Sequence, residues 1–124
     1  MEYELEVRRR LERPSHRGIR AEGSGGAVQA TAEDRSLNVW VCMQVEVSGG
    51  TVVGVRFAAY GCPHFLAGAD WIAERLEGRP ATTLAGPVAR EAAAALHVPT
   101  EKLGKLLVIE DAIAACAARV ARSA

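Results

Sequence analysis

The clearest pattern of apolar and polar positions runs from Leu37 to Val47, where every second side chain is apolar. Such alternation is typical of a β-strand with one buried face. The side chains expected on that face are Val39, Val41, Met43, Val45 and Val47. The run Ser48-Gly49-Gly50 predicts a turn, so residues 51–59 should return antiparallel as the second strand of a hairpin.

The segment that opens the chain fits two different periods. Tyr3, Leu5 and Val7 alternate as in a strand, whereas Tyr3, Val7 and Leu11 lie on one face of a helix. We favour a helix over residues 2–13, because its acidic residues come early, its arginines come late and a proline follows it.

The next segment, residues 15–26, is rich in glycine, serine and charge. This composition predicts a flexible loop in which His16 faces solvent. Residues 27–33 are compatible with a short strand, and Asp34-Arg35-Ser36 is typical of a turn that leads into the hairpin.

The second half of the chain shows helical spacing of its apolar residues. Pro63 suits the first turn of a helix that should end near Gly78. A second helix is expected from Pro87 to about Leu96, and a long last helix after a break at Gly104. The order of elements predicts an α+β fold, with a small antiparallel sheet of two to three strands and helices packed on one of its faces.

Composition and charge narrow the class of protein. A chain of 124 residues that is 49% hydrophobic suits one domain over residues 1–124. Its 15 basic residues balance its 15 acidic ones and aromatic residues are few, which disfavours binding to nucleic acid or to an anionic membrane. Its longest apolar stretches are too short to span a membrane and its first residues do not resemble a signal peptide, so we expect a cytoplasmic protein.

The three cysteines, Cys42, Cys62 and Cys116, form no Cys-x-x-Cys pair, and reduced thiols are their simplest state. Cys42 lies beside Trp40 on the second face of the predicted strand, and Cys116 lies on the apolar face of the last helix. Their positions on the predicted strand and helix indicate that both thiols are packed and take no part in chemistry.

Candidate chemistry is concentrated in the run Tyr60-Gly61-Cys62-Pro63-His64. An extended segment ends there at a glycine and places Cys62 at the start of a helix, where free amides and the helix dipole favour a thiolate. A thiolate is the better nucleophile and metal ligand. His64 is a candidate assisting residue, but nothing in the sequence orients it toward Cys62 as a catalytic base, and we expect no enzymatic activity.

Three further groups of residues carry a family resemblance over nearly the whole chain. They are an opening with Tyr3, Val7, Leu11, Pro14 and Gly18, a strand-to-cysteine run from Val55 to Cys62, and a closing section with Pro99, Lys102 and Glu110-Asp111-Ala112-Ile113. In this order they resemble the IscU/NifU-type iron–sulfur cluster assembly scaffolds. The resemblance implies a compact α+β domain with a small antiparallel sheet.

The resemblance also implies a metal site, most of whose ligands this chain lacks. Family scaffolds assemble a cluster on three cysteines, helped by an aspartate and often a histidine, and only the middle cysteine is present, as Cys62. The first cysteine falls at Leu37 and the aspartate at Val39, while the late histidine–cysteine pair falls at Gly104 and Lys105. Leucine and valine have no donor atom and lysine is normally protonated, so the metal site is predicted to be degenerate.

Three functions remain open at this point, of which the weakest is a small cysteine-dependent enzyme that uses Cys62 with His64 as base. The first is a divergent scaffold-like protein that cannot hold a full cluster alone and accepts a persulfide sulfur on Cys62 from a cysteine desulfurase, with Lys105 supplying positive charge. An iron–sulfur cluster or zinc would then be held only if two subunits of a homo-oligomer shared it. The alternative is a non-catalytic binding or regulatory module that kept the scaffold fold and lost the metal chemistry.

Overall fold

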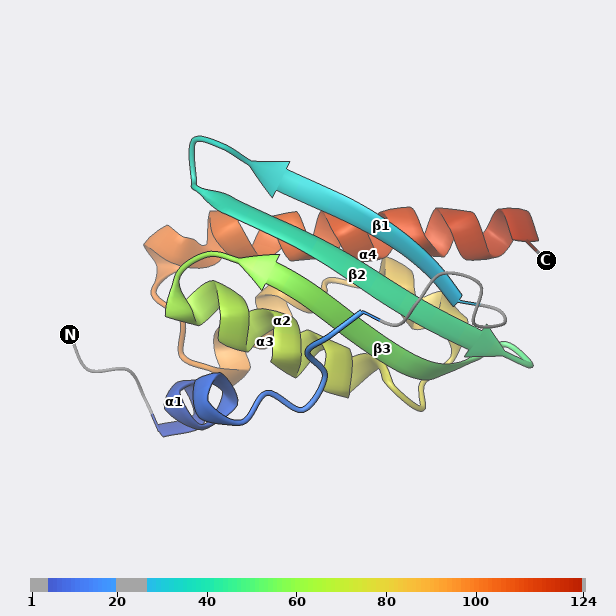
Figure 1. The fold of residues 1–124 in the computed structure, drawn as a ribbon, viewed down its shortest axis with the longest axis horizontal. Helices are drawn as coiled ribbons and strands as arrows, with labels where there is room; N and C mark the ends of the chain where they lie inside the picture. The colour runs from blue at the N-terminus through green and yellow to red at the C-terminus, as the bar shows by residue number, and fades with distance from the viewer. Residues whose placement is uncertain (1–4, 20–26, 124) are drawn as a thin grey trace.

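The computed structural model describes residues 5–19 and 27–123, which form a three-stranded antiparallel sheet with helices on one face (Figure 1). The strands are β1 (Ala27–Asp34), β2 (Val39–Ser48) and β3 (Thr51–Tyr60), in that order across the sheet. The helices are α1 (Leu5–Glu12), α2 (Pro63–Leu76), α3 (Val88–Ala95) and α4 (Leu103–Ser123), with the short 3-10 helices η1 (Ala81–Ala85) and η2 (Thr100–Lys102). The predicted α+β class is confirmed.

The core lies between the sheet and two of the helices. Helix α4 packs against β1 and β2, and α2 packs against β3. The alternation along β2 is confirmed, because Val39, Val41, Met43 and Val45 are all buried. Val47 follows a bulge in the ladder to β3 and is half-buried. Each fully buried side chain of this size contributes about 1.5–3 kcal/mol to folding, so this face anchors the sheet.

Two predicted boundaries were wrong. Strand β2 begins at Val39, because Leu37 belongs to a turn in which the Asp34 side chain accepts a hydrogen bond from the Leu37 amide at 3.2 Å. The predicted break at Gly104 does not occur, since α4 runs through it from Leu103. Gly104 lies in the first turn of α4, where a glycine interrupts less of the helical hydrogen bonding than it would in the middle.

The segment after α1 lies against β3. The Phe57 amide donates to the His16 carbonyl at 3.0 Å, and the Gly18 amide donates to the Phe57 carbonyl at 2.7 Å. The start of the predicted loop is therefore hydrogen-bonded to the sheet, whereas residues 20–26 lie outside the described residues. The helix predicted over residues 2–13 is present from Leu5, and its first positions lie outside the described residues as well. No helix in the described ranges is long and apolar enough to cross a membrane.

Candidate functional site

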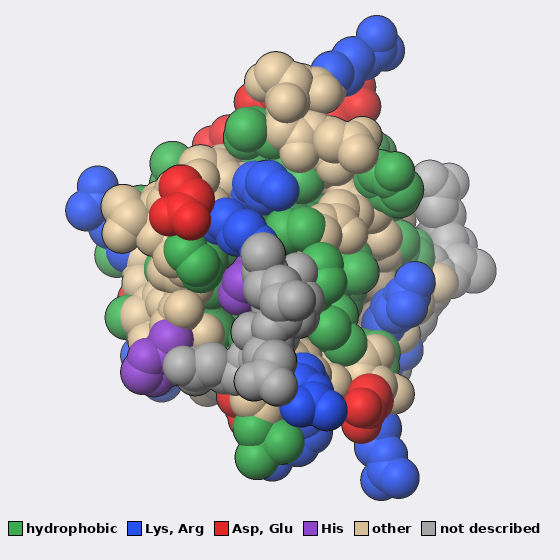
Figure 2. All heavy atoms as spheres, turned by 90° about the vertical axis from the view of Figure 1, so that its left-hand side faces the viewer, with side chains coloured by type: hydrophobic (Ala, Val, Ile, Leu, Met, Phe, Trp, Pro, Cys, Tyr) green, Lys and Arg blue, Asp and Glu red, His purple; other side chains and the backbone are tan. Residues whose placement is uncertain are grey.

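The residues that the sequence singled out lie at one end of the sheet, where β2 begins, β3 ends and both α2 and α4 start (Figure 1, left). Antiparallel pairing puts the start of β2 beside the end of β3, with Trp40 opposite Tyr60. Figure 2 views this end directly and shows hydrophobic side chains at the surface among separate lysine and arginine side chains, with a histidine between them.

Cys62 is the residue before the first turn of α2, as predicted. Its carbonyl accepts the first helical hydrogen bond, from the Leu66 amide at 3.1 Å. The side chain is half-buried against the core, and its sulfur makes no capping hydrogen bond to the helix. Of the three cysteines, only Cys62 is not buried. It is therefore the thiol that a partner protein could reach.

Gly61 explains how the strand meets the helix so closely. A Cβ atom at this position would lie 2.7 Å from Cδ2 of Phe65 and 3.1 Å from Cγ1 of Val39. No real side chain fits in that space without moving its neighbours. The missing side chain at Gly61 therefore allows Val39 and the first turn of α2 to approach each other beside Cys62.

The positions that correspond to family ligands are also brought together. A Cβ atom at Gly104 would lie 3.9 Å from Cδ1 of Leu37, an ordinary van der Waals distance, so the start of α4 faces the turn before β2. Leu37 is half-buried against the core. The resemblance thus named positions that meet in space, although Leu37 and Gly104 bring no metal-binding atom there.

His64 lies at the same end of the sheet as Cys62 but is only 7% exposed. Lys102 Nζ donates a hydrogen bond to His64 Nδ1 at 3.0 Å. Burial lowers the pKa of His64, and the positive charges of Lys102 and then Lys105 lower it further. Because Nδ1 accepts a hydrogen bond, the neutral ring carries its proton on Nε2.

The contact between His64 and Lys102 was not predicted. Lys102 entered the sequence analysis only through the family resemblance, and no spacing rule pairs residues 38 positions apart. Lys105 is close enough to act on the pKa of His64 and is half-buried. Lys105 therefore lies near His64, and Lys102 adds a second positive charge beside the same ring.

This set of donors does not suit an iron–sulfur cluster. Clusters are held mainly by thiolates, and the site offers one thiol and a histidine that is bonded to a lysine. Within residues 5–19 and 27–123, no three histidine, cysteine, aspartate or glutamate side chains are grouped so that they could hold a metal ion.

The other two cysteines are packed thiols, as predicted. Cys42 and Cys116 are buried, with 5% and 0% of their surface exposed. Burial raises the pKa of Cys42. Burial, followed by the nearby Cys42, raises the pKa of Cys116 to about 12. Both groups therefore remain protonated and poorly nucleophilic near neutral pH.

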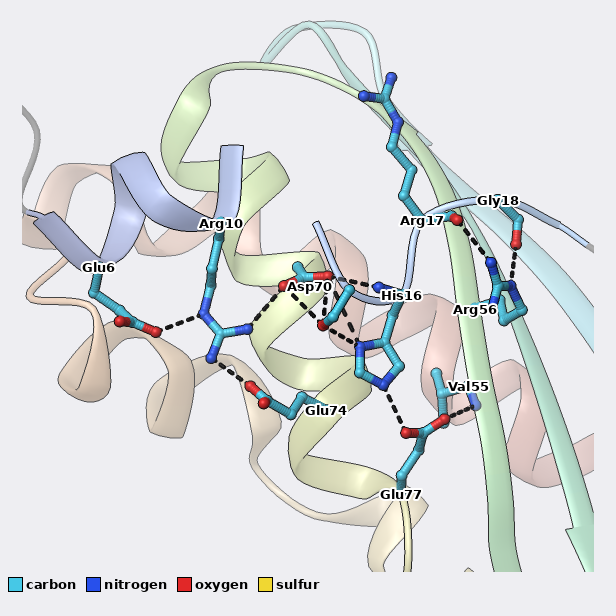
Figure 3. Close-up of polar contacts among 11 residues, drawn as sticks. Glu6, Arg10, His16, Arg17, Gly18, Val55, Arg56, Asp70, Glu74 and Glu77 are labelled. Carbon is cyan, nitrogen blue, oxygen red and sulfur yellow. Dashed lines mark hydrogen bonds and ion pairs between the residues drawn. The ribbon is translucent and has the colours of Figure 1, made fainter. Parts of the chain in front are cut away.

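A separate cluster of charged residues joins α1 and the segment after it to α2 (Figure 3). Its centre is Asp70, which is 1% exposed and accepts hydrogen bonds from Arg10 at 2.8 Å and from the His16 amide at 2.9 Å. Arg10 also bonds Glu74 and Glu6. The hydrogen bond from Arg10 is the main cause that lowers the pKa of Glu74.

The prediction that His16 faces solvent was wrong. Its side chain is 12% exposed, and Nε2 lies 2.6 Å from the Glu77 carboxylate. On the other side of the ring, Nδ1 lies 2.6 Å from the Ser15 hydroxyl. The cluster pairs its charges with one another, and these bonds tie α1 and the segment after it to α2.

Comparisons with known proteins agree with this architecture. Residues 2–123 match the family model described as the NifU-like N terminal domain. A protein from Fervidobacterium islandicum AW-1, described as an iron–sulfur cluster assembly scaffold for the SUF system, superposes with a TM-score of 0.68 at 14% identity, over 93% of this chain and 96% of the other. The N-terminal part of a nitrogen-fixing NifU-like protein from Brucella abortus gives 0.73 at 17% identity, over 98% and 95%. A comparison with curated protein sequences gives no match.

Proposed function

Since the chain belongs to the family of NifU-like N-terminal domains, we propose that it takes part in iron–sulfur cluster assembly as a sulfur acceptor. In this proposal Cys62 receives sulfur as a persulfide, and the chain alone does not hold a finished cluster. A cysteine desulfurase, whose product is a cysteine persulfide, is the partner that the chemistry requires.

One observation carries the proposal. Cys62 is the one cysteine within reach of a partner, at the start of α2, while the other positions that would complete a metal site are filled by groups without a usable donor. Those groups are Leu37, Val39, Gly104 and Lys105. A site with one accessible thiol suits transfer of a single sulfur atom better than retention of a cluster.

The transfer needs no outside oxidant or reductant. The Cys62 thiolate attacks the outer sulfur of the desulfurase persulfide and forms a new sulfur–sulfur bond. The old sulfur–sulfur bond breaks, and the desulfurase cysteine leaves as a thiolate. The product persulfide on Cys62 is an anion, which the free amides of α2 and the positive charge of Lys105 would stabilise.

The experiment is incubation with a cysteine desulfurase and free cysteine, followed by mass spectrometry of the intact and digested protein. We expect one added sulfur atom, mapped to Cys62, and none in Cys62→Ser. Cys42→Ala is the matched control, because Cys42 is buried, and it should still accept the sulfur. Lys105→Gln should accept it several-fold more slowly if its charge stabilises the persulfide.

Several outcomes would contradict the proposal. Addition of sulfur to another residue, or none at all, would remove Cys62 from the role, and capture of the desulfurase without transfer would favour a binding module instead. Anaerobic incubation with iron and sulfide adds an independent test. The protein should stay colourless, and a cluster absorption that depends on Cys62 would show a holding scaffold.

A further inference from the structure

The outer edge of β3 is covered from Val52 to Phe57. Backbone groups along this stretch bond to the chain around it. The bonds are Val52 N–H to the Arg79 carbonyl (2.8 Å), Gly78 N–H to the Val52 carbonyl (2.7 Å), Val55 N–H to the Glu77 carboxylate (2.9 Å), Phe57 N–H to the His16 carbonyl (3.0 Å) and Gly18 N–H to the Phe57 carbonyl (2.7 Å). Because these bonds occupy the backbone groups of the edge, another strand cannot pair with β3 there.

The outer edge of β1 differs. Strand β1 pairs with β2 in unbroken register from Ala27 to Asp34 and is the last strand on its side of the sheet. The amide and carbonyl of Phe57 bond to the segment after α1, so they point away from β2. Phe57 and its partner Met43 are therefore a non-hydrogen-bonded pair, and the amide and carbonyl of Met43 point toward Ala30 of β1. The odd-numbered residues of β1 therefore direct their amides and carbonyls outward. Among the described residues, no hydrogen bond reaches them.

Residues 27–32 of β1 lack the features that usually protect an open edge, and the charges of Glu33 and Asp34 come only at the end of the strand. Natural edge strands carry charges, prolines or bulges that prevent another strand from pairing. Residues 27–32 contain no charge and no proline, and the ladder to β2 contains no bulge. Within residues 5–19 and 27–123, the chain thus closes one edge with several contacts and leaves the other suited to pairing.

We propose that the edge of β1 is an interface between two copies of this chain. The copies pair their β1 strands antiparallel about a two-fold axis, and their sheets join into one. Identical antiparallel strands are complementary to each other under such an axis, because each residue meets its counterpart in the reverse order. The two uncharged stretches would then lie side by side at the centre.

The distribution of charge favours a second copy over an unrelated strand. The exposed Glu33 lies near the end of β1, whereas the exposed Arg122 lies in the last turn of α4. Figure 1 shows that α4 ends on the side of the sheet where β1 starts. The two-fold axis therefore brings the acidic end of each β1 toward the basic end of the other copy's α4.

The arrangement has a consequence for Cys62. Cys62 follows β3 at the end of the sheet where β1 finishes. In an antiparallel pair of β1 strands, these ends point in opposite directions, so the two Cys62 residues lie at opposite ends of the joined sheet. A metal or cluster shared between two Cys62 thiols is incompatible with this dimer.

Analytical ultracentrifugation over about a hundredfold range of concentration tests the interface. We expect a monomer–dimer equilibrium in the wild type. Thr31→Lys, at an exposed and outward-directed position of β1, should raise the dissociation constant at least about fivefold, because two lysines then meet near the axis. Val53→Lys is the matched control on β3, where 50% of the side chain is exposed, and should leave the equilibrium unchanged.

Amide hydrogen exchange locates the interface independently of the variants. The amides of Gln29, Thr31 and Glu33 should exchange more slowly in concentrated than in dilute wild-type protein. A monomer at every concentration would overturn the proposal. So would a dimer that Thr31→Lys and Val53→Lys weaken equally, or a dimer whose slowly exchanging amides lie outside β1. These results are independent of sulfur transfer to Cys62, so the two proposals can fail separately.

Discussion

At the scale of single residues, His64 is held in a place that disfavours its charged form. Burial, then Lys102 and Lys105, lower its pKa below the ordinary value near 6.5. At a pH below that ordinary value, His64 is protonated in the unfolded chain but still neutral in the folded chain. Lowering the pH therefore costs stability, from the unfolded pKa down through the folded one.

The variant His64→Gln should remove this part of the pH dependence, since glutamine keeps an acceptor for Lys102 and does not titrate. Thermal unfolding from about pH 7.5 to about pH 5.5 measures it. The wild type should lose more stability than the variant over this range. Parallel curves for the two proteins would show that His64 does not carry the effect.

The sequence predicted the position of Cys62 in the fold better than the surroundings of the histidines. The position of Cys62 followed from a glycine before it and a proline after it, which are local signals. The contacts of His64 with Lys102 and of His16 with Glu77 join residues far apart in the chain. No local pattern reports such contacts, and the loop composition around His16 wrongly indicated exposure.

At the scale of elements, α1 is fixed to α2 by an ion pair that is largely shielded from water. The Arg10 and Asp70 side chains are 11% and 2% exposed. Removing one partner of a buried pair leaves the other without compensation and is strongly destabilising. We expect Arg10→Gln to lower the free energy of unfolding by about 2–3 kcal/mol, which urea denaturation measures.

Arg9→Gln is the matched control for this experiment. Arg9 is the neighbouring residue, is 69% exposed and pairs only at the surface, with Glu6. Its substitution should cost at most about 0.5 kcal/mol. Equal losses in both variants would mean that the burial of the Arg10–Asp70 pair has no special weight in docking α1.

The elements themselves were largely predictable, but their contacts were less so. The alternation in β2 and the helical spacing after Pro63 both reflect burial of one face, which side-chain patterns record directly. The pairing of residues 16–18 with β3 combines backbone hydrogen bonds with two bonds from the Arg56 side chain to the Arg17 and Gly18 carbonyls. The segment itself contributes only backbone groups, which every residue has, so its side-chain pattern contains no signal for that contact.

At the scale of the whole molecule, the fold brings close together positions that the family resemblance assigns to metal ligands. A Cβ atom at Gly104 would lie 3.9 Å from Cδ1 of Leu37, and Cys62 and Lys105 lie at the same end of the sheet. Returning donor atoms should therefore return metal binding. We expect the variant Leu37→Cys/Gly104→His/Lys105→Cys to bind about one zinc ion per chain, in competition with a coloured chelator.

The controls for this variant show whether zinc binds at one site formed by several residues or to individual cysteines. Adding Cys62→Ser to the triple variant should abolish tight binding, and Leu37→Cys alone should not create it. Val39 is left unchanged because it is 4% exposed, and a buried aspartate would destabilise the core. If the triple variant binds zinc no better than the wild type, the positions are not arranged as ligands.

Glu77 has a consequence for how the molecule opens. One of its carboxylate oxygens accepts the Val55 amide of β3, and the other lies 2.6 Å from His16. A single side chain at the end of α2 is thus shared between the sheet edge and the N-terminal segment. Releasing that segment also removes a partner from the edge, so the two should open as one cooperative unit in native-state exchange.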